Sequence, residues 1–377
     1  MTEKKLGFGM MRVPLLDKDD QKSVDMPRLE AMVDAFLAAG FRYFDTAFMY
    51  HDFCSERFIK EALVKRHPRE DFLLADKMPL SMLKREEDVA SIYNKQKEKT
   101  GVDFFDYYLM HDMNQGNYEI AKKMGALDFG RRRKAEGEIR HLGFSFHDSA
   151  DVLEQILEEN PDMEFVQLQI NYLDWDSEGV QSGKCYEVAK AHGVPVIVME
   201  PVKGGTLAKV PEDVEKDMLA MHPDWSIASW AIRFAASLRN VKVVLSGMSS
   251  MEQMEDNLAC MQAFEPLGQK EKDLLLQDAR KIRERIAVPC TGCRYCVEES
   301  TCPKNIPIPE YFALYNTQHL QMDRSWTPEW EYYSNYVEQG YGSAGACIAC
   351  RQCERVCPQH IAVSERMKDV KALMEDR

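Results

Sequence analysis

Short apolar runs alternate with stretches of helical period along the first two-thirds of the chain, from Leu6 to about Phe264. Apolar runs bounded by turn residues are typical of buried strands, whereas apolar positions spaced by three and four are typical of helices packed on a sheet. In the segment 27–40, for example, apolar residues follow the helical spacing and Gly40 stands where the helix is expected to end. The pattern therefore predicts a series of β-α units.

Eight such units are predicted, which places this part of the chain in the α/β class. The expected strands lie at 6–14, 41–47, 72–77, 106–111, 139–145, 165–171, 194–200 and 241–247. Eight units over about 260 residues is the size of a (β/α)8 TIM barrel. A doubly wound open sheet is the alternative, but no G-x-G-x-x-G motif follows the first strand, so the barrel is favoured.

The remaining chain predicts a linker and a second domain. We expect the barrel to occupy residues 1–264, a charged helix to form a linker over 265–288, and a small domain to follow over 289–377. That last segment holds eight of the eleven cysteines of the chain, in the runs CTGCRYCVEESTCP and CIACRQCERVCP. Its chemistry is therefore expected to depend on those thiols.

Each cysteine run has three cysteines in C-x-x-C-x-x-C spacing and a fourth followed directly by proline. This spacing is typical of 4Fe-4S clusters, and in two-cluster ferredoxins the fourth cysteine ligates the other cluster. Structural zinc, the alternative, usually requires two well-separated C-x-x-C pairs. The predicted ligand sets are Cys290, Cys293, Cys296 and Cys357 for one cluster, and Cys347, Cys350, Cys353 and Cys302 for the other.

Cys302 is the least regular of these ligands, because five residues separate it from Cys296 where the second run has three. The two runs otherwise form an internal repeat that places Ile306 and Ile361 alike, as apolar lids over the clusters. The 44 residues between the runs (303–346) are too many for a compact bacterial ferredoxin. They look helical over 308–322 and 329–341, so the domain resembles an α-helical ferredoxin.

Polar residues stand at successive strand ends of the predicted barrel, where the function of such a fold is located. Asp45, Lys77 and His111 end the second, third and fourth strands, and Tyr50 follows Asp45 by five residues. This set suits carbonyl reduction, with Tyr50 giving a proton to the oxygen. We expect Lys77 to lower the pKa of Tyr50, Asp45 to hold Lys77, and His111 to bind the carbonyl oxygen. Helix capping, packing and a satisfied core histidine are the alternatives for the individual residues.

The motifs FDTAFMYHDFCSERFIKEAL, LADK, YYLMHD, GEIRHLGFS, VQLQINYL and SGMSSMEQMEDNL resemble those of the aldo-keto reductases, in the same order over roughly 240 residues. The resemblance implies an NAD(P)H-dependent barrel in which Asp45, Tyr50, Lys77 and His111 form the catalytic tetrad. It also implies that Ser145 and Gln169 hold the nicotinamide carboxamide, and that Asn257 contacts the adenine end of the cofactor.

Some positions depart from the pattern of the family. The chain reads SFHD where many members have Ser-Asn, which leaves Phe146 or His147 in the second role. A tyrosine that often stacks on the nicotinamide is replaced by Met199, and the basic residues that read the 2'-phosphate of NADPH are replaced by Gly247 and Gln253. Loss of these cations weakens the case for NADPH, so NADPH and NADH both stay open.

The loop after the seventh predicted strand reads VKGGTLA. Its glycines, Gly204 and Gly205, could cover the pyrophosphate of the cofactor, or they could form a turn that binds no ligand.

The charge balance narrows the choice of partners. A formal net charge of −14 does not favour nucleic acid or anionic membrane surfaces, and no apolar run approaches the roughly 18 residues that span a bilayer. We therefore expect a cytoplasmic protein with a small carbonyl substrate, and a redox protein is a further possible partner.

Hydride chemistry moves two electrons and each cluster moves one, so direct coupling would require a converter such as a flavin, for which no signature is seen. Three hypotheses follow from this combination. The favoured one is a carbonyl reductase that carries the ferredoxin-like domain. The others are an electron-transfer protein coupling NAD(P)H to a redox partner, and a nicotinamide-sensing barrel without turnover.

Overall fold

The computed structural model describes residues 4–17, 20–177, 180–300, 302–320 and 328–376. The chain divides into two compact units. The first, here the barrel unit, comprises Met1–Ser177, Gln181–Val202 and Asp224–Lys272. The second, here the cysteine unit, comprises Glu178–Val180, Lys203–Pro223 and Asp273–Arg377. Residues 203–223, which lie inside the predicted barrel segment, thus group with the cysteine-rich part of the chain.

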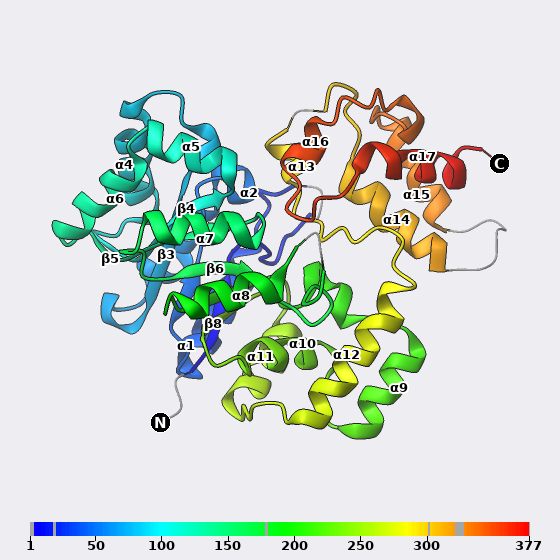
Figure 1. Cartoon of the computed structure of the whole chain (residues 1–377), viewed down its shortest axis with the longest axis horizontal. Helices are drawn as coiled ribbons and strands as arrows, with labels where there is room; N and C mark the ends of the chain where they lie inside the picture. Colours follow the sequence, from blue (N-terminus) through cyan, green and yellow to red (C-terminus); the bar gives the residue numbers. More distant parts are fainter. Residues whose placement is uncertain (1–3, 18–19, 178–179, 301, 321–327, 377) are drawn as a thin grey trace. The chain divides into compact units, whose positions relative to one another are not determined.

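The barrel unit contains a closed barrel of eight parallel strands in sequence order, in which β1 pairs with both β2 and β8 (Figure 1). Closure excludes the open doubly wound sheet and confirms the predicted (β/α)8 fold. The strands are β1 (Leu6–Gly9), β2 (Tyr43–Asp45), β3 (Leu73–Pro79), β4 (Phe105–Met113), β5 (Ile139–Phe146), β6 (Val166–Gln169), β7 (Val196–Met199) and β8 (Val241–Gly247). Each predicted strand overlaps one of these.

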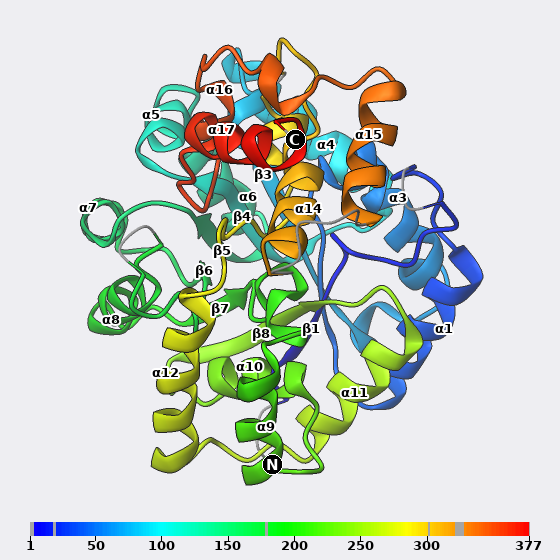
Figure 2. The same ribbon diagram turned by 90° about the vertical axis from the view of Figure 1, so that its right-hand side faces the viewer.

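Helices surround the strands of the barrel unit (Figures 1 and 2). They are α1 (Met26–Ala38), α2 (Tyr50–Phe53), α3 (Ser55–Ile59), α4 (Glu86–Thr100), α5 (Gln115–Lys123), α6 (Ala126–Ala135), α7 (Ala150–Glu159), α8 (Ser182–Ala191), α10 (Ile227–Ala236) and α11 (Met251–Gln262). The apolar face of α1 shows why they pack there: Phe36 contacts Phe8 of β1 and Phe44 of β2 at ring distances of 5.8 and 5.2 Å.

The inside of the barrel is filled by side chains that alternate along the strands. Tyr43, Ala75, Leu109 and Ile197 belong to one buried apolar cluster of this interior. Successive strand side chains point to opposite faces, so residues two positions further along each strand also point inward. Asp45, Lys77 and His111 follow Tyr43, Ala75 and Leu109 by two residues, which places them above this apolar layer at the carboxyl ends of the strands.

The cysteine unit is built from helices, and its described residues contain no strand. Its elements are α9 (Glu212–Met221), most of α12 (Gln269–Arg283), α13 (Tyr295–Glu298), α14 (Ile308–Leu320), α15 (Pro328–Glu338), α16 (Gln352–Arg355) and α17 (Val363–Met374). The predicted helices at 265–288, 308–322 and 329–341 correspond to α12, α14 and α15. None of the helices in the described part of the whole chain combines the length and the apolar composition that a membrane crossing requires.

The core of the cysteine unit gathers aromatic and aliphatic side chains around the cysteines. Tyr311 and Phe312 of α14 are almost fully buried, and Tyr311 packs against Tyr333 of α15 with ring centroids 4.4 Å apart. Four cysteines of the two runs pack against this cluster as partly buried residues, and Cys296 and Cys353 belong to it. Six of the eight cysteines of the two runs therefore lie in or against an apolar core, whereas Cys350 is exposed.

Candidate functional sites

Asp45, Lys77 and Tyr50 come together at the carboxyl end of the barrel. Lys77 is fully buried, and its Nζ donates hydrogen bonds to Asp45 Oδ1 at 2.5 Å, to the Thr46 carbonyl at 2.8 Å and to the Tyr50 hydroxyl at 3.2 Å. The neighbouring strands β2 and β3 carry Asp45 and Lys77 at adjacent levels of the barrel. The ammonium is thus held by three oxygens, one of which is the phenol.

Burial and charge act in opposite directions on this group. Burial alone would lower the pKa of Lys77, but the Asp45 carboxylate and the Tyr50 oxygen outweigh it and the pKa is raised, so the amine stays charged. For Tyr50, burial raises the pKa and the Lys77 ammonium lowers it. Burial is the larger effect, and the expectation that Lys77 brings the Tyr50 pKa below its ordinary value of 10.0 is wrong. Tyr50 therefore keeps its proton at neutral pH.

His111 lies beside Tyr50, with the two rings nearly perpendicular and their centroids 6.0 Å apart. The imidazole is almost fully buried. Burial, together with the charges of Lys77 and His147, holds the pKa of His111 well below 6.5. A neutral imidazole donates from only one ring nitrogen, so His111 can act as a hydrogen-bond donor without carrying charge.

The turn that carries Tyr50 has an unusual backbone. The three residues after Tyr50, His51, Asp52 and Phe53, have φ values of 51°, 54° and 65°, in the left-handed region that side-chain-bearing residues rarely adopt. His51 fixes this turn, because its two ring nitrogens lie 3.0 Å from the carbonyl oxygens of Gln21 and Met10. Strained backbone held in this way is typical of functional positions.

Gln167 of β6 is a member of this site that the sequence analysis missed. Its side-chain amide donates a hydrogen bond of 3.0 Å to Asp45 Oδ2, and the residue is buried. The carboxylate of Asp45 is therefore held on one oxygen by Lys77 and on the other by Gln167. The only sequence signal was the alternation of Gln167 and Gln169 with apolar residues along β6, which places both amides inside the barrel.

The residues expected to contact the nicotinamide carboxamide are buried at the ends of β5 and β6. The Ser145 hydroxyl accepts a hydrogen bond of 2.9 Å from the Asp112 amide, and the Gln169 side chain donates one of 2.8 Å to Asp174. Of the two candidates for the second role, Phe146 is buried and His147 is half-buried. His147 is also near enough to His111 to affect its pKa, which favours His147 at this edge of the barrel.

The residues expected at the other end of the cofactor lie around the end of β8. Asn257 is buried and donates a hydrogen bond of 2.9 Å to Ser246. Gly247 and Gln253 are exposed, whereas Met199, the residue expected against the nicotinamide, is half-buried at the end of β7. Gln253 accepts a hydrogen bond of 2.8 Å from the Ser249 amide.

Arg12, just after β1, is a second residue that the sequence analysis did not single out. A Cβ atom placed on Gly247 would lie 3.0 Å from the Arg12 Cβ, so the arginine stands against the position where the family has a basic residue. Its guanidinium pairs with Glu200 at 3.3 Å. A cation is therefore present at this end of β8, but it comes from the segment that follows β1.

The cysteines of the cysteine unit line two cavities, and each cavity is lined by cysteines of both runs. One cavity is lined by Cys290, Cys293, Cys296 and Cys357. The other is lined by Cys302, Cys347, Cys350 and Cys353. We call these the first and the second cluster site. Each combines three cysteines of one run with the fourth cysteine of the other, as the spacing predicts, and Cys302 reaches its site despite the longer interval.

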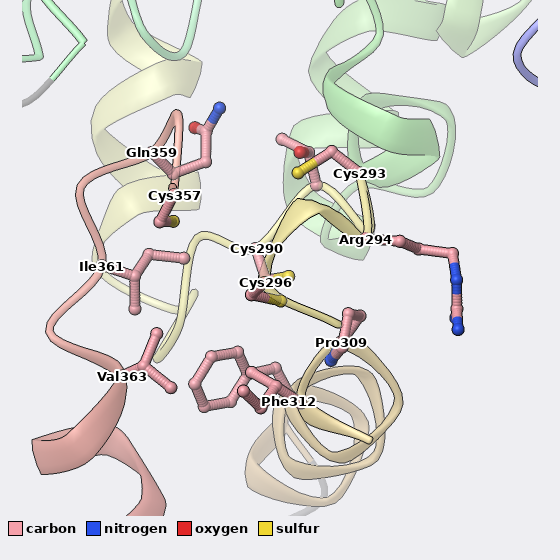
Figure 3. A pocket seen from close by; sticks show the side chains of 12 residues that line it. Cys290, Cys293, Arg294, Cys296, Pro309, Phe312, Cys357, Gln359, Ile361 and Val363 are labelled. Carbon is pink, nitrogen blue, oxygen red and sulfur yellow. The ribbon is translucent and has the colours of Figure 1, made fainter. Parts of the chain in front are cut away.

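The surroundings of the first cluster site are apolar (Figure 3). Phe312, Ile361 and Val363 line it together with the thiols, while the Arg294 side chain extends away from it. The Gly292 amide donates a hydrogen bond of 3.4 Å to Cys290 Sγ. Ile306 lines the second cluster site as Ile361 lines the first, in agreement with their predicted role as lids.

These residues fit an iron-sulfur cluster better than zinc. Four thiols around each cavity, apolar walls and an amide donor to sulfur are features that such clusters use. A structural zinc site is typically built from two separate C-x-x-C pairs, whereas each cavity here combines three cysteines of one run with one cysteine of the other.

Comparison with known proteins assigns both parts of the chain to families. The sequence model of the aldo/keto reductase family matches residues 5–275, and that of a 4Fe-4S dicluster domain matches residues 289–362. The chain is 24% identical over 257 residues to L-galactose dehydrogenase of Arabidopsis thaliana, a match that covers 62% of this chain and 78% of the relative.

Solved structures share the fold of the barrel. The holo form of an aldo-keto reductase from Bacillus halodurans is 22% identical, with a TM-score of 0.58 over 73% of this chain and 91% of that one. An aldo-keto reductase from Klebsiella pneumoniae in complex with NADPH is 17% identical, with a TM-score of 0.59 over 75% of this chain and 96% of that one. Since the family model covers well over half of the sequence and the closed barrel agrees with it, the chain belongs to the aldo/keto reductase family.

Proposed function

We propose that the protein reduces a small aldehyde or ketone with NAD(P)H as the hydride donor. The observation that carries this proposal is the distance of 3.2 Å between the Tyr50 hydroxyl and the Lys77 ammonium, with Asp45 on the far side of the ammonium. A phenol so placed can release its proton to a carbonyl oxygen, because the neighbouring cation stabilises the phenolate that remains.

Each residue of the barrel site has a separate role in the proposed reaction. Tyr50 gives a proton to the substrate oxygen, and Lys77 stabilises the phenolate as the proton leaves. Neutral His111 donates a hydrogen bond to the same oxygen and fixes its direction. When bound, the nicotinamide supplies the hydride. The raised pKa of Tyr50 keeps its hydroxyl protonated before each turnover.

Ser145, Gln169 and Asn257 are proposed to hold the cofactor, with Met199 against the nicotinamide and with Gly247 and Gln253 near the adenine ribose. NADPH and NADH are both retained as cofactors. Arg12 supports NADPH, because it brings a guanidinium beside Gly247; Glu200 opposes it, because it already pairs with that guanidinium. The likeness to L-galactose dehydrogenase supports a sugar or sugar-derived carbonyl among the substrates.

We further propose that the cysteine unit binds two 4Fe-4S clusters, one at each cluster site. Such clusters transfer single electrons. Two cysteine-lined cavities in one unit therefore support a second candidate function, in which the chain exchanges electrons with a redox protein partner. A cytoplasmic location is also proposed, because a reducing compartment keeps thiols available as ligands and does not convert them to disulfides.

Substitution of the proposed acid tests the first function. Tyr50→Phe removes the proton donor and keeps the ring, so we expect carbonyl reduction to fall by roughly 10² to 10⁴-fold, while cofactor affinity, followed by nicotinamide fluorescence, stays the same. Tyr341→Phe, at an exposed position of the cysteine unit, is the matched control and should have no effect. Unchanged turnover in Tyr50→Phe would reject the proposal.

The proposed clusters are tested independently by analysis of anaerobically purified protein. Two 4Fe-4S clusters require about eight iron and eight acid-labile sulfide per chain. Zinc without sulfide would exclude them, and it would leave the proposal for the barrel unaffected.

A further inference from the structure

The segment after β7 belongs to the cysteine unit, where it lies against the first cluster site. Lys203 is only four residues beyond the end of β7, yet it is 1% exposed and its Nζ donates a hydrogen bond of 2.9 Å to Gln359 Oε1. Gln359 lines the first cluster site and follows its ligand Cys357 by two residues. The ammonium is thus buried and hydrogen-bonded to a residue of the wall of this site.

The neighbouring glycine lies against the backbone next to a second ligand of the same site. A Cβ atom on Gly204 would lie 2.1 Å from the carbonyl oxygen of Thr291, the residue after Cys290. Lys203 itself has φ 49°, in the left-handed region, so the backbone is held in an unfavourable conformation at this point. The close approach indicates that Lys203 is placed there by packing and is not a loosely attached surface residue.

The charge of Lys203 would act on a cluster held at the first site, because its ammonium is buried and hydrogen-bonded to Gln359, a residue that lines this site. In surroundings of low dielectric constant a unit charge acts more strongly than in water and is little screened by salt.

The other basic residues near the two sites are compensated or exposed. Arg294 lines the first site, but its guanidinium pairs with both Glu298 and Glu310. Lys304 and Arg351 line the second site and are both exposed to solvent. Water and salt screen such charges, so a buried lysine distinguishes the first site from the second.

Reduction of a 4Fe-4S cluster adds one electron and hence one negative charge, which a nearby cation stabilises. We propose that Lys203 is a positioning residue that raises the reduction potential of the cluster at the first site above that of the second. The first electron from a one-electron donor therefore resides on the cluster held by Cys290, Cys293, Cys296 and Cys357. This inference rests on the proposed function of the cysteine unit, namely that both clusters are bound.

The test is an anaerobic redox titration of the full chain with dithionite, followed by the electron paramagnetic resonance signal of the reduced clusters. Wild-type protein should show two one-electron steps. Lys203→Gln should lower the higher step by at least about tenfold in its equilibrium constant, which is about 59 mV for one electron, and leave the lower step in place. Lys203→Arg keeps the charge and should restore the wild-type titration.

Two further variants complete the test. Gln359→Glu sets a carboxylate against the ammonium, so it should shift the higher step in the same direction as Lys203→Gln even if that variant fails to fold. Arg351→Gln removes an exposed charge at the second site and should move either step by less than about threefold, since solvent screens it.

The possible outcomes separate this inference from the function on which it rests. Fewer than eight iron in the wild-type chain would refute the two-cluster function itself. With eight iron present, the role of Lys203 is overturned by a single merged step in the wild type. It is also overturned if Lys203→Gln or Gln359→Glu retains its iron and the potential of its higher step equals that of the wild type. A titration of Lys203→Arg that matches the titration of Lys203→Gln would overturn it as well.

Discussion

Removal of the ammonium at the centre of the barrel site should destabilise the barrel strongly, and removal of both members of its ion pair should not. Lys77→Met keeps the length of the side chain but leaves the Asp45 carboxylate buried, with Gln167 as the remaining partner that the structure shows for it. Asp45 is 3% exposed, so water cannot replace the lost contact without opening the barrel. Lys77→Met/Asp45→Asn removes both charges together and retains an amide beside Gln167.

The expected magnitudes follow from the geometry. At 2.5 Å, with an effective dielectric constant of about 20, the attraction between Lys77 and Asp45 is about 7 kcal/mol. The desolvation of two ions costs several kcal/mol each and cancels most of this, so the intact pair contributes little net stability. Loss of one partner leaves an uncompensated charge, which costs roughly 3–5 kcal/mol. The double variant should lie within about 2 kcal/mol of the wild type, since it buries no unpaired charge.

Hydrogen exchange of the backbone amides of β2 and β3 measures the free energy of opening at this place. Lys65→Met is the matched control, because Lys65 pairs with Glu61 at 2.6 Å but both side chains are about half exposed; it should cost less than about 1 kcal/mol. Additive effects of the two single substitutions, or a Lys77→Met variant as stable as the control, would show that the pair is not coupled as the structure implies.

Two further predictions concern proton transfer and packing. Because Tyr50 acts in its protonated form and its pKa is raised, kcat/KM for carbonyl reduction should fall only above pH 10.0. Because the pKa of His111 is lowered, the pH profile of kcat/KM should show no titration of His111 between pH 6.5 and 10.0. A decrease of kcat/KM that begins below pH 9 would contradict the assignment of Tyr50 as the acid. Gly143→Ala sets a Cβ atom 2.3 Å from the Phe165 carbonyl oxygen and should cost about 1–3 kcal/mol of barrel stability by hydrogen exchange, whereas Gly116→Ala, in the helix α5, should be neutral or slightly stabilising. Equal effects of the two alanines would refute the packing argument.

The barrel could be predicted from the sequence because its signal is local and repeated. Each strand is an apolar run, and each helix has its own period, so eight units could be recognised without any long-range contact. Strand ends were less certain: β3 continues to Pro79 and β4 to Met113, both two residues beyond the polar residues taken as ends. Lys77 and His111 are nevertheless inside the barrel, because alternation along the strand, not the position of the last residue, decides which way they point.

The parts that sequence reasoning missed all depend on contacts between distant residues. Gln167 binds Asp45 across 122 positions of the chain, and Arg12 reaches Gly247 only because β1 and β8 are neighbours in the closed barrel. The net pKa of Tyr50 is a sum over everything that surrounds the phenol, so a single favourable neighbour could not settle its direction. Lys203 is the extreme case, since its partner Gln359 lies 156 residues away.

The cysteine spacing could predict the residues that line each cavity because the turn that carries three of them is local in sequence. The same turn explains why the longer interval before Cys302 is tolerated. In each run an arginine in the left-handed region, Arg294 or Arg351, precedes a one-turn helix that carries the third cysteine. The extra residues of the first run come after that helix and before Cys302, so they do not disturb the three-cysteine loop.

The fourth cysteine is placed by a second repeated turn. The carbonyls of Cys302 and Cys357 each accept a hydrogen bond of 3.0 Å from the amide three residues later, that of Asn305 or His360. Both of these residues have φ near 50°, which directs the following isoleucine back over the cavity. Each Cys-Pro turn thus places both a cysteine and the isoleucine that covers it at the cluster site of the other run. The ligand set is therefore determined by the geometry of this turn, and the number of residues before it can vary.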